Sequence, residues 1–502
     1  MIIKLLKKPY AAVVFSWLIL AILFAPILYS DYAYLDDAHF LWHNRDHSNY
    51  TIFFSQGRWL TGILLNKFFF SISTIASIKI LRVFAFVSWL LFLAEFFRLG
   101  KKWQLLIGFE NKLLFISGIY IACSLSVAIY IGWAACFEVG IATLLGLWAG
   151  HLFFAHLMQN RASKITSRTA LLLPAVMGIS SLYLYQPAFG AFFIPFAFYF
   201  INKKSLADYK LLFNGTIYYF VIIVAYYILF LLSLKIGAVA ASDRTTISTD
   251  VLGKLSFFFG MPLSQAFSFN FLFNTHSIMS QALPIAMMLL WVATFLKTNK
   301  TKPVNKLLFI SSFVAICMCI YLPVLVGREN FASYRTMFAF NFVVTLLLID
   351  TILSLHTSKK IKIFFSLILG CCFIGVAYRN FRYNFIGPLQ QEYQLVSNAF
   401  NKNYHAGIDT IYFLRPAENA FYKPYGIVSY KDEFGVPSTF KDWTPEPLIK
   451  QLILEKTKDR QQAERITIIQ FIDRASFEEV KNKKLNAAYL DPELLFLEGS
   501  KR

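Results

Sequence analysis

The sequence YAAVVFSWLILAILFAPILY occupies residues 10–29 and contains no charged side chain. About 20 residues of α-helix are enough to cross the hydrocarbon core of a bilayer. The preceding segment MIIKLLKKPY is basic, like the start of a signal peptide, but no small-residue cleavage site follows the long apolar run. We therefore interpret residues 10–29 as a retained first transmembrane helix with its basic flank in the cytoplasm.

The same apolar character continues along most of the 502-residue chain, which is 57% hydrophobic, only 15% charged and contains 54 phenylalanines. Soluble globular proteins are roughly 45–50% apolar and roughly 25% charged. The composition excludes a soluble enzyme, a disordered protein, a coiled coil and a disulfide-rich secreted module. The six cysteines lie in apolar runs without the spacing of metal ligands or of a disulfide framework. The chain is predicted to be a polytopic protein of the lipid bilayer.

The net charge of +20 is concentrated in the apolar part of the chain. Residues 379–502 carry a net charge of +2, and residues 1–378 carry +18. Six basic clusters separate the apolar runs, and one threading places all of them in the cytoplasm, as the positive-inside rule requires. The excess charge is therefore a topology signal, and no nucleic-acid partner is expected.

This threading predicts about eleven transmembrane helices, a cytoplasmic N-terminus and an outer C-terminus. They fall near residues 10–29, 78–97, 113–131, 134–158, 169–186, 187–201, 211–234, 277–296, 307–326, 334–355 and 361–378. Residues 59–76 are also apolar, but a span there would move Arg98 and its basic neighbours outside. We expect them to lie along the outer leaflet. The fold class is an all-α polytopic membrane protein, with a transmembrane domain at 1–378 and its first outer loop at 30–77.

The segment 379–502 contains no span and is predicted to be a small α/β domain outside the membrane. Two runs are typical of strands, TIYFL at 410–414 and ITIIQFI at 466–472. Between them, TPEPLIKQLILEK predicts a helix with Thr444 as N-cap and Pro445 at its first position.

Acidic residues of the transmembrane domain gather on the outer side of this threading. Eight of its twelve carboxylates fall there: Asp31, Asp36, Asp37, Asp46, Glu138, Asp243, Asp250 and Glu329. Acidic residues contribute little to orientation, so the bias is independent of the rule that set the topology. It indicates that the protein works at its outer face.

The adjacent pair Asp36–Asp37 in the first outer loop is the candidate catalytic group. A carboxylate within hydrogen-bond reach of an acceptor hydroxyl can act as a general base. The alternative is that one of the two caps a helix beginning near Ala38. Arg58 is a candidate cation for a phosphate, because its fork can bind such a group bidentately.

Further candidates lie at the outer ends of later helices. Arg328, Glu329 and Arg335 share the loop GRENFASYR at 327–335, where the arginines either contact a phosphate or extend to lipid headgroups. Glu138 is an ionisable group at a membrane boundary, or simply an acid at a helix N-terminus. Tyr185 and Gln186 could contact a sugar, or could merely end a helix before proline. Asp243–Arg244 could shape a groove for lipid.

A metal site is the weaker alternative in the first outer loop. His39, His43 and His47 recur every four residues and would share one face of a helix with Asp36. Such a stripe is also typical of the polar side of an interfacial helix. We therefore expect no required cofactor, and leave a divalent metal open as the lesser alternative.

Several short motifs together resemble the Gtr type-II serotype-converting O-antigen glucosyltransferases of bacteria and their phages. The motifs are YLDD at 34–37, GRWL at 57–60 and SLYLYQP at 181–187, and in the tail DEFG at 432–435 followed by Trp443. The resemblance implies a GT-C class enzyme of the bacterial inner membrane that takes glucose from undecaprenyl phosphate on the periplasmic side. The acceptor would be a lipid-linked O-antigen or a similar envelope glycan, and a small membrane flippase is an implied partner.

The resemblance also implies that an acidic residue of the first outer loop is the base, and here Asp37 is favoured over Asp36. The loop lacks an Asp-x-Asp spacing, which weakens the case for a metal. Two other functions stay open. The helix count would also suit a transporter or flippase of a lipid-linked sugar, although no internal repeat is apparent. The tail would also suit a non-catalytic scaffold that binds a partner.

Overall fold

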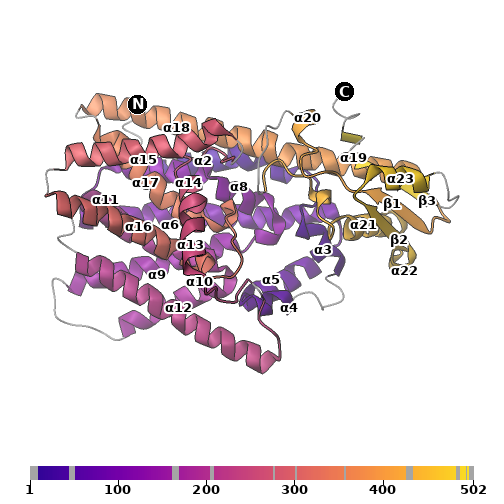
Figure 1. Ribbon diagram of the computed structural model, residues 1–502, viewed down its shortest axis with the longest axis horizontal. Helices are drawn as coiled ribbons and strands as arrows, with labels where there is room; N and C mark the ends of the chain where they lie inside the picture. The colour runs from indigo at the N-terminus through magenta and orange to yellow at the C-terminus, as the bar shows by residue number, and fades with distance from the viewer. Residues whose placement is uncertain are drawn as a thin grey trace.

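The computed structural model describes residues 9–43, 51–160, 169–203, 209–242, 244–274, 277–299, 302–355, 358–425, 433–481, 487–492 and 495–496. In this part of the chain, long helices run side by side along the long axis, and a small unit with β-strands lies at one end (Figure 1). The same end carries three short helices of the segment predicted as the first outer loop, α3 (Asp36–His43), α4 (Thr51–Ser55) and α5 (Trp59–Phe70).

The bundle is built from helices that follow the predicted spans, and each of the eleven spans coincides with helical backbone. These helices are α2 (Pro9–Phe24), α6 (Lys79–Ile107), α7 (Asn111–Cys123), α8 (Leu125–Gly132), α9 (Val139–Asn160), α10 (Thr169–Leu184), α11 (Ile194–Lys203), α12 (Tyr209–Gly237), α15 (Ile278–Thr298), α16 (Pro303–Leu325), α17 (Phe338–Ser354) and α18 (Lys359–Phe381). A helical, polytopic architecture is therefore confirmed.

Fewer spans are counted when a helix must be both long enough and apolar enough to cross a membrane. Among the described residues, seven helical segments are long and apolar enough to cross a membrane, and the pair α7–α8 makes an eighth if it is one span bent by 41°. Helices α10, α11 and α17 are shorter, so the count of eleven stays a prediction. Helix α5 has only 12 residues, whereas a span needs about 20. Its length fits the interfacial placement predicted for 59–76.

Local backbone features explain where helix α6 ends and where helix α13 begins. Helix α6 continues ten residues beyond the predicted end and stops at Gly108, whose φ of +88° is a left-handed C-cap that glycine adopts without strain. Between α12 and α15 the chain forms two short helices, α13 (Val251–Gly260) and α14 (Pro262–Ala266). Asp250 caps α13 by accepting a hydrogen bond from the backbone N–H of Gly253 at 2.8 Å.

The tail contains the predicted α/β elements and one strand more. Strands β1 (Thr410–Leu414), β2 (Thr467–Phe471) and β3 (Ala487–Leu490) form a parallel sheet in the order β2-β1-β3. The sequence analysis missed β3 because its four residues are too short a run to show alternation. Helices α20 (Tyr422–Tyr425), α21 (Pro445–Thr457), α22 (Arg460–Arg465) and α23 (Arg474–Lys481) connect the strands.

The predicted N-cap of the tail helix, Thr444, is confirmed in position but not in its side-chain hydrogen bond. Helix α21 does begin at Pro445, but the side chain of Thr444 makes no capping hydrogen bond. Its backbone is already helical, with φ −90° and ψ −43°. In this conformation its hydroxyl does not reach the free N–H groups of the first helical turn. The residue marks the helix start without stabilising it in the predicted way.

The tail joins the bundle through a continuous helical rod, Lys359–Asn403. Helix α18 passes through a π-helical turn at Arg382–Ile386 into α19 (Gly387–Asn403), which carries the chain into the tail (Figure 1). Alternate residues of β1 face opposite sides of the sheet. Ile411 and Phe413 belong to the main hydrophobic core, and Tyr412 and Leu414 form a small second core with Phe477 of α23. One face of the sheet therefore packs toward the membrane domain.

Candidate functional site

The acidic pair at the start of α3 is split between two environments. Leu35 adopts a positive φ of 44° immediately before the helix, and the two following carboxylates point in different directions. The side chain of Asp37 is fully buried. Its Oδ2 accepts a hydrogen bond from the N–H of Tyr34 at 3.1 Å, and its Oδ1 accepts one from the N–H of Ala135 at 2.9 Å. Asp37 therefore ties the first outer loop to the segment before α9.

The partner of Asp37 is Arg82 of α6, which is also fully buried. Its Nη2 lies 3.5 Å from Oδ2 of Asp37, and its guanidinium stacks 3.4 Å above the ring of Tyr32. It also donates hydrogen bonds to the carbonyls of Ser30 and Tyr32. Burial raises the pKa of Asp37 to about 6 despite the attraction of Arg82. The sequence analysis missed Arg82, although a lone arginine near the outer end of an apolar helix was the available signal.

Asp36 keeps part of its surface accessible. Its Oδ1 accepts a hydrogen bond from the indole N–H of Trp443 at 2.9 Å. Burial raises the pKa of Asp36, while the positive charges of Arg335, Arg244 and Arg58 act to lower it. A base must touch its substrate. Asp36 is thus the accessible carboxylate of the pair and feels the charges of three arginines, whereas the sequence favoured Asp37 as the base.

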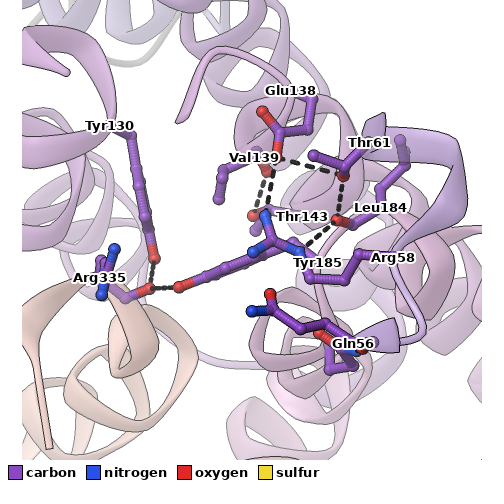
Figure 2. A network of polar contacts seen from close by, with 11 residues as sticks. Gln56, Arg58, Thr61, Tyr130, Glu138, Val139, Thr143, Leu184, Tyr185 and Arg335 are labelled. Atoms are coloured by element: carbon purple, nitrogen blue, oxygen red, sulfur yellow. Dashed lines mark hydrogen bonds and ion pairs between the residues drawn. The ribbon is translucent and has the colours of Figure 1, made fainter. Parts of the chain in front are cut away.

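Arg58 precedes α5 and is held by several groups (Figure 2). Its Nη2 lies 3.1 Å from Oε1 of Glu138, and its Nε donates to the carbonyl of Leu184 at 3.3 Å. The guanidinium lies 4.8 Å from the ring centre of Tyr185. Thr61 also donates to Oε1 of Glu138, at 3.3 Å. A fixed guanidinium is a preorganised anion site.

Glu138 itself is fully buried, and within the described residues its Oε2 has no hydrogen-bond partner. Glu138 does not line the cavity described below, and its predicted contact with a sugar stays a prediction. Its side chain instead fixes Arg58. The chain turn before Arg58 needs Gly57, which has φ +70° and where a Cβ would lie 2.3 Å from the hydroxyl of Tyr226.

Arg335 reaches the same region from the short 3₁₀ turn Tyr334–Thr336. Its Nε lies 3.2 Å from Oε1 of Glu433 in the tail, and its guanidinium lies between the rings of Trp133 and Phe331, at 4.8 and 4.9 Å. The hydroxyls of Tyr130 and Tyr185 both donate to the backbone carbonyl of Arg335 (Figure 2). Both the backbone and the side chain of Arg335 are therefore held in place.

Arg58 and Arg335 border a cavity of about 420 Å³. Its polar end carries three arginines, Arg58, Arg244 and Arg335, together with Glu329. Its apolar wall comes from α12 and from the C-terminal end of α16, and includes Phe220, Ile223, Val224, Ile228, Leu322, Pro323, Val324 and Val326. A second, almost entirely apolar groove runs along α12 and shares Phe220, Val224 and Ile228 with the cavity. The site thus combines a cationic end with a long apolar surface.

The other predicted residues divide into two groups. Tyr185 and Gln186 line the cavity, and Nε2 of Gln186 donates to the carbonyl of Gln56 at 2.7 Å and to the hydroxyl of Tyr226 at 3.0 Å. Glu329 also lines it and pairs with Nε of Arg244 at 2.8 Å. Arg328 is exposed and is not part of the lining. Arg244 lines the cavity, and the predicted phosphate contact of Arg328 stays a prediction.

The histidine stripe is only partly described. His39 and His43 lie on α3 with their ring centres 4.6 Å apart, and His47 lies outside the described residues. Burial lowers the pKa of His39 to about 4. Within the described ranges, no group of three or more His, Cys, Asp or Glu side chains could hold a metal ion. A metal stays open as the lesser alternative.

No family model, no curated protein and no solved structure matches this chain. The resemblance of its motifs to the glucosyltransferase family therefore stays a prediction.

Proposed function

We propose that the protein is a GT-C class glycosyltransferase that moves a hexose from a polyprenyl phosphate to a glycan acceptor at the outer face of a bacterial inner membrane. The observation that carries this proposal is the cavity whose end holds Arg58, Arg244 and Arg335 and whose wall continues into an apolar groove on α12. A lipid-linked phosphate needs both surfaces at once. The arginines suit the phosphate, and the groove suits the prenyl chain.

The accessible carboxylate of Asp36 supplies the base. It takes the proton of the acceptor hydroxyl, and the acceptor oxygen forms a bond to the anomeric carbon. The bond from that carbon to the phosphate oxygen breaks, and the polyprenyl phosphate leaves with the electron pair. The arginines stabilise the charge that develops on the leaving phosphate. One in-line displacement inverts the anomeric configuration.

The motif resemblance supplies the finer assignment. On that basis the donor is undecaprenyl phosphate-linked glucose, and the acceptor is a lipid-linked O-antigen or similar envelope glycan. The N-terminus lies in the cytoplasm, the tail lies in the periplasm, and a small membrane flippase delivers the loaded carrier. No resident cofactor takes part in the displacement as written.

A transfer assay tests the proposal. Membranes with the protein are given undecaprenyl phosphate carrying labelled glucose and a lipid-linked O-antigen acceptor. Wild type should move the label to the glycan, and Asp36→Asn should abolish transfer while still inserting. Asp31→Asn is the matched control, because Asp31 lies in the same loop and its ion pair with Lys79, at 3.8 Å, is half-exposed.

Three outcomes distinguish the proposed function from its alternatives. Transfer from another carrier-linked sugar but not from glucose would keep the class and change the donor. Full transfer by Asp36→Asn would remove Asp36 as the base. Movement of a lipid-linked sugar across vesicles without a covalent product would favour the transporter or flippase alternative.

A further inference from the structure

A segment of the tail, residues 433–443, lies against the turn that carries the acidic pair. The hydroxyl of Tyr34 donates to the carbonyl of Glu433 at 3.0 Å, and the N–H of Leu35 donates to Oγ of Ser438 at 2.8 Å. The third contact is the indole N–H of Trp443 on Oδ1 of Asp36. In Figure 1, α3 and the tail helix α21 lie next to each other at this end of the molecule. The turn at 34–36 is therefore bonded to the tail at three successive residues.

The segment is also fixed from behind by the rod that leaves the bundle. Glu392 of α19 is only 2% exposed. Its carboxylate accepts hydrogen bonds from the N–H of Ser438 and the N–H of Thr439, both at 2.9 Å, and from the hydroxyl of Thr439 at 2.6 Å. A buried carboxylate with three donors holds backbone firmly. The segment is thus clamped between the membrane domain and the rod.

Its two ends reach two charged groups of the site. Glu433 is 5% exposed, and its Oε1 contacts Nε of Arg335 at 3.2 Å and accepts from the hydroxyl of Ser333 at 2.6 Å. At the other end, Trp443 is bonded to Asp36 while 45% of its side chain stays exposed. The same piece of tail therefore fixes one cavity arginine and the accessible carboxylate.

We propose that Trp443 and Glu433 are positioning residues of the transferase site, which is complete only when the tail segment 433–443 is docked on the first outer loop. Trp443 occupies one oxygen of Asp36 and thereby orients the other toward the acceptor hydroxyl. Glu433 fixes the guanidinium of Arg335 toward the phosphate. This inference rests on the proposed function and adds that the tail is part of the catalytic machinery.

The role of Trp443 has a signature that general destabilisation does not share. Its hydrogen bond favours the charged form of Asp36, so losing the N–H raises the pKa of that carboxyl. The other charges facing Asp36 are Arg335, Arg244, Arg58 and the neighbouring Asp37, and none of them changes in a tryptophan variant. Trp443→Phe removes the N–H and keeps an aromatic ring, so the acid limb of the pH–rate profile should move to higher pH.

The experiment compares wild type, Trp443→Phe and Trp17→Phe in the transfer assay as a function of pH. Trp17 is the matched control because its indole N–H also makes one hydrogen bond of 2.9 Å, to the carbonyl of Leu90, away from the site. We expect Trp443→Phe to lose roughly 10-fold to 100-fold in kcat, with little change in KM for the donor and a raised acid limb. Trp17→Phe should match wild type.

Glu433→Gln is the second variant, since it keeps the shape and the bond to Ser333 but weakens the hold on Arg335. We expect it to lower kcat without shifting the acid limb by as much as Trp443→Phe does. An active wild type with an unmoved acid limb in Trp443→Phe would overturn the positioning role alone. A wild type that transfers no carrier-linked sugar would overturn the proposed function and this inference with it.

Discussion

The side chains of Asp37 and Arg82 form an ion pair in which neither has exposed surface, with 3.5 Å between Oδ2 and Nη2. Removing one partner of such a pair leaves an uncompensated buried charge, which costs about 3–5 kcal/mol. Arg82→Met should therefore lower the thermal unfolding midpoint of the solubilised protein strongly at pH 8. Adding Asp37→Asn to it should restore part of the loss, because the double variant no longer buries a lone charge. A double variant less stable than Arg82→Met would contradict this account.

The loss of stability caused by Arg82→Met should also depend on pH. Burial raises the pKa of Asp37 from 3.8 to about 6 in the folded protein, so the folded state binds this proton more tightly than the unfolded state. The stability that the proton contributes is complete below pH 3.8 and is lost as the pH rises through 6. Without Arg82 this pKa rises further. The loss of stability caused by Arg82→Met should then be smaller at pH 5 than at pH 8, measured as the difference in unfolding midpoints.

The pair also shows which parts of the site a sequence can predict. Apolar runs bounded by basic clusters predict helices, because a span needs a fixed length of apolar chain. The outer loops with Asp36, Arg58, Gln186 and Arg335 follow from that threading, and the structure brings these residues to one end of the bundle. The sequence does not decide which of two adjacent carboxylates is buried, because that depends on where Arg82 arrives from α6.

The same limit applies to partners distant in the sequence. Glu433 and Trp443 enter the sequence analysis only through the motif resemblance, and nothing in their spacing indicates contacts with Arg335 and Asp36. Arg244 and Arg328 look equivalent as outer-loop arginines, yet only Arg244 lines the cavity. These outcomes depend on the docking of the tail and on the path of the chain around α13, which periodicity does not encode.

Substituting Arg244 and Arg328 one at a time tests which of the two arginines binds the donor phosphate. Arg244→Gln removes one charge that lines the cavity, and the loss of a charged hydrogen bond of about 1.5–3 kcal/mol corresponds to roughly 10-fold to 100-fold in kcat/KM for the donor. Arg328→Gln should change this value by less than about 2-fold. Donor titrations at fixed acceptor measure both. Equal losses in the two variants would mean that Arg328 contacts the phosphate as well, as the sequence predicted.

Glu138 is expected to act through Arg58 rather than on the sugar. Glu138→Gln removes the charge that competes with a phosphate for the guanidinium, 3.1 Å away. The product polyprenyl phosphate should therefore bind more tightly, while a less firmly held Arg58 lowers kcat. We expect KM for the donor to fall along with kcat, a pattern that the loss of a direct sugar contact would not produce. Steady-state kinetics give the split, and a raised KM would favour the sugar contact instead.

The pH dependence of transfer should follow the carboxyl of Asp36. Burial raises its pKa above the ordinary 3.8, and only the deprotonated form can accept a proton. The value of kcat/KM should therefore fall as the pH is lowered, with its midpoint above pH 3.8. Arg335 is the strongest of the charges that lower this pKa, so Arg335→Gln should move the midpoint to higher pH. The control is Arg98→Gln, which breaks the pair with Glu95 on the same helix, α6. A shift in both variants would mean that the acid limb reports another group.

The apolar groove on α12 makes a prediction that does not involve any charged group. Val224 is 54% exposed and lies on the surface shared by the cavity and the groove. Val224→Trp should fill this surface, displace the prenyl chain and raise KM for a long-chain donor by roughly 10-fold or more, since each buried CH₂ contributes about 0.8 kcal/mol. A donor with a short, water-soluble prenyl chain should be affected less. Leu232→Trp is the matched control, because Leu232 is 51% exposed on the same helix but belongs to neither surface. If both variants raise KM equally, the groove is ordinary lipid-facing helix surface and the prenyl chain binds elsewhere.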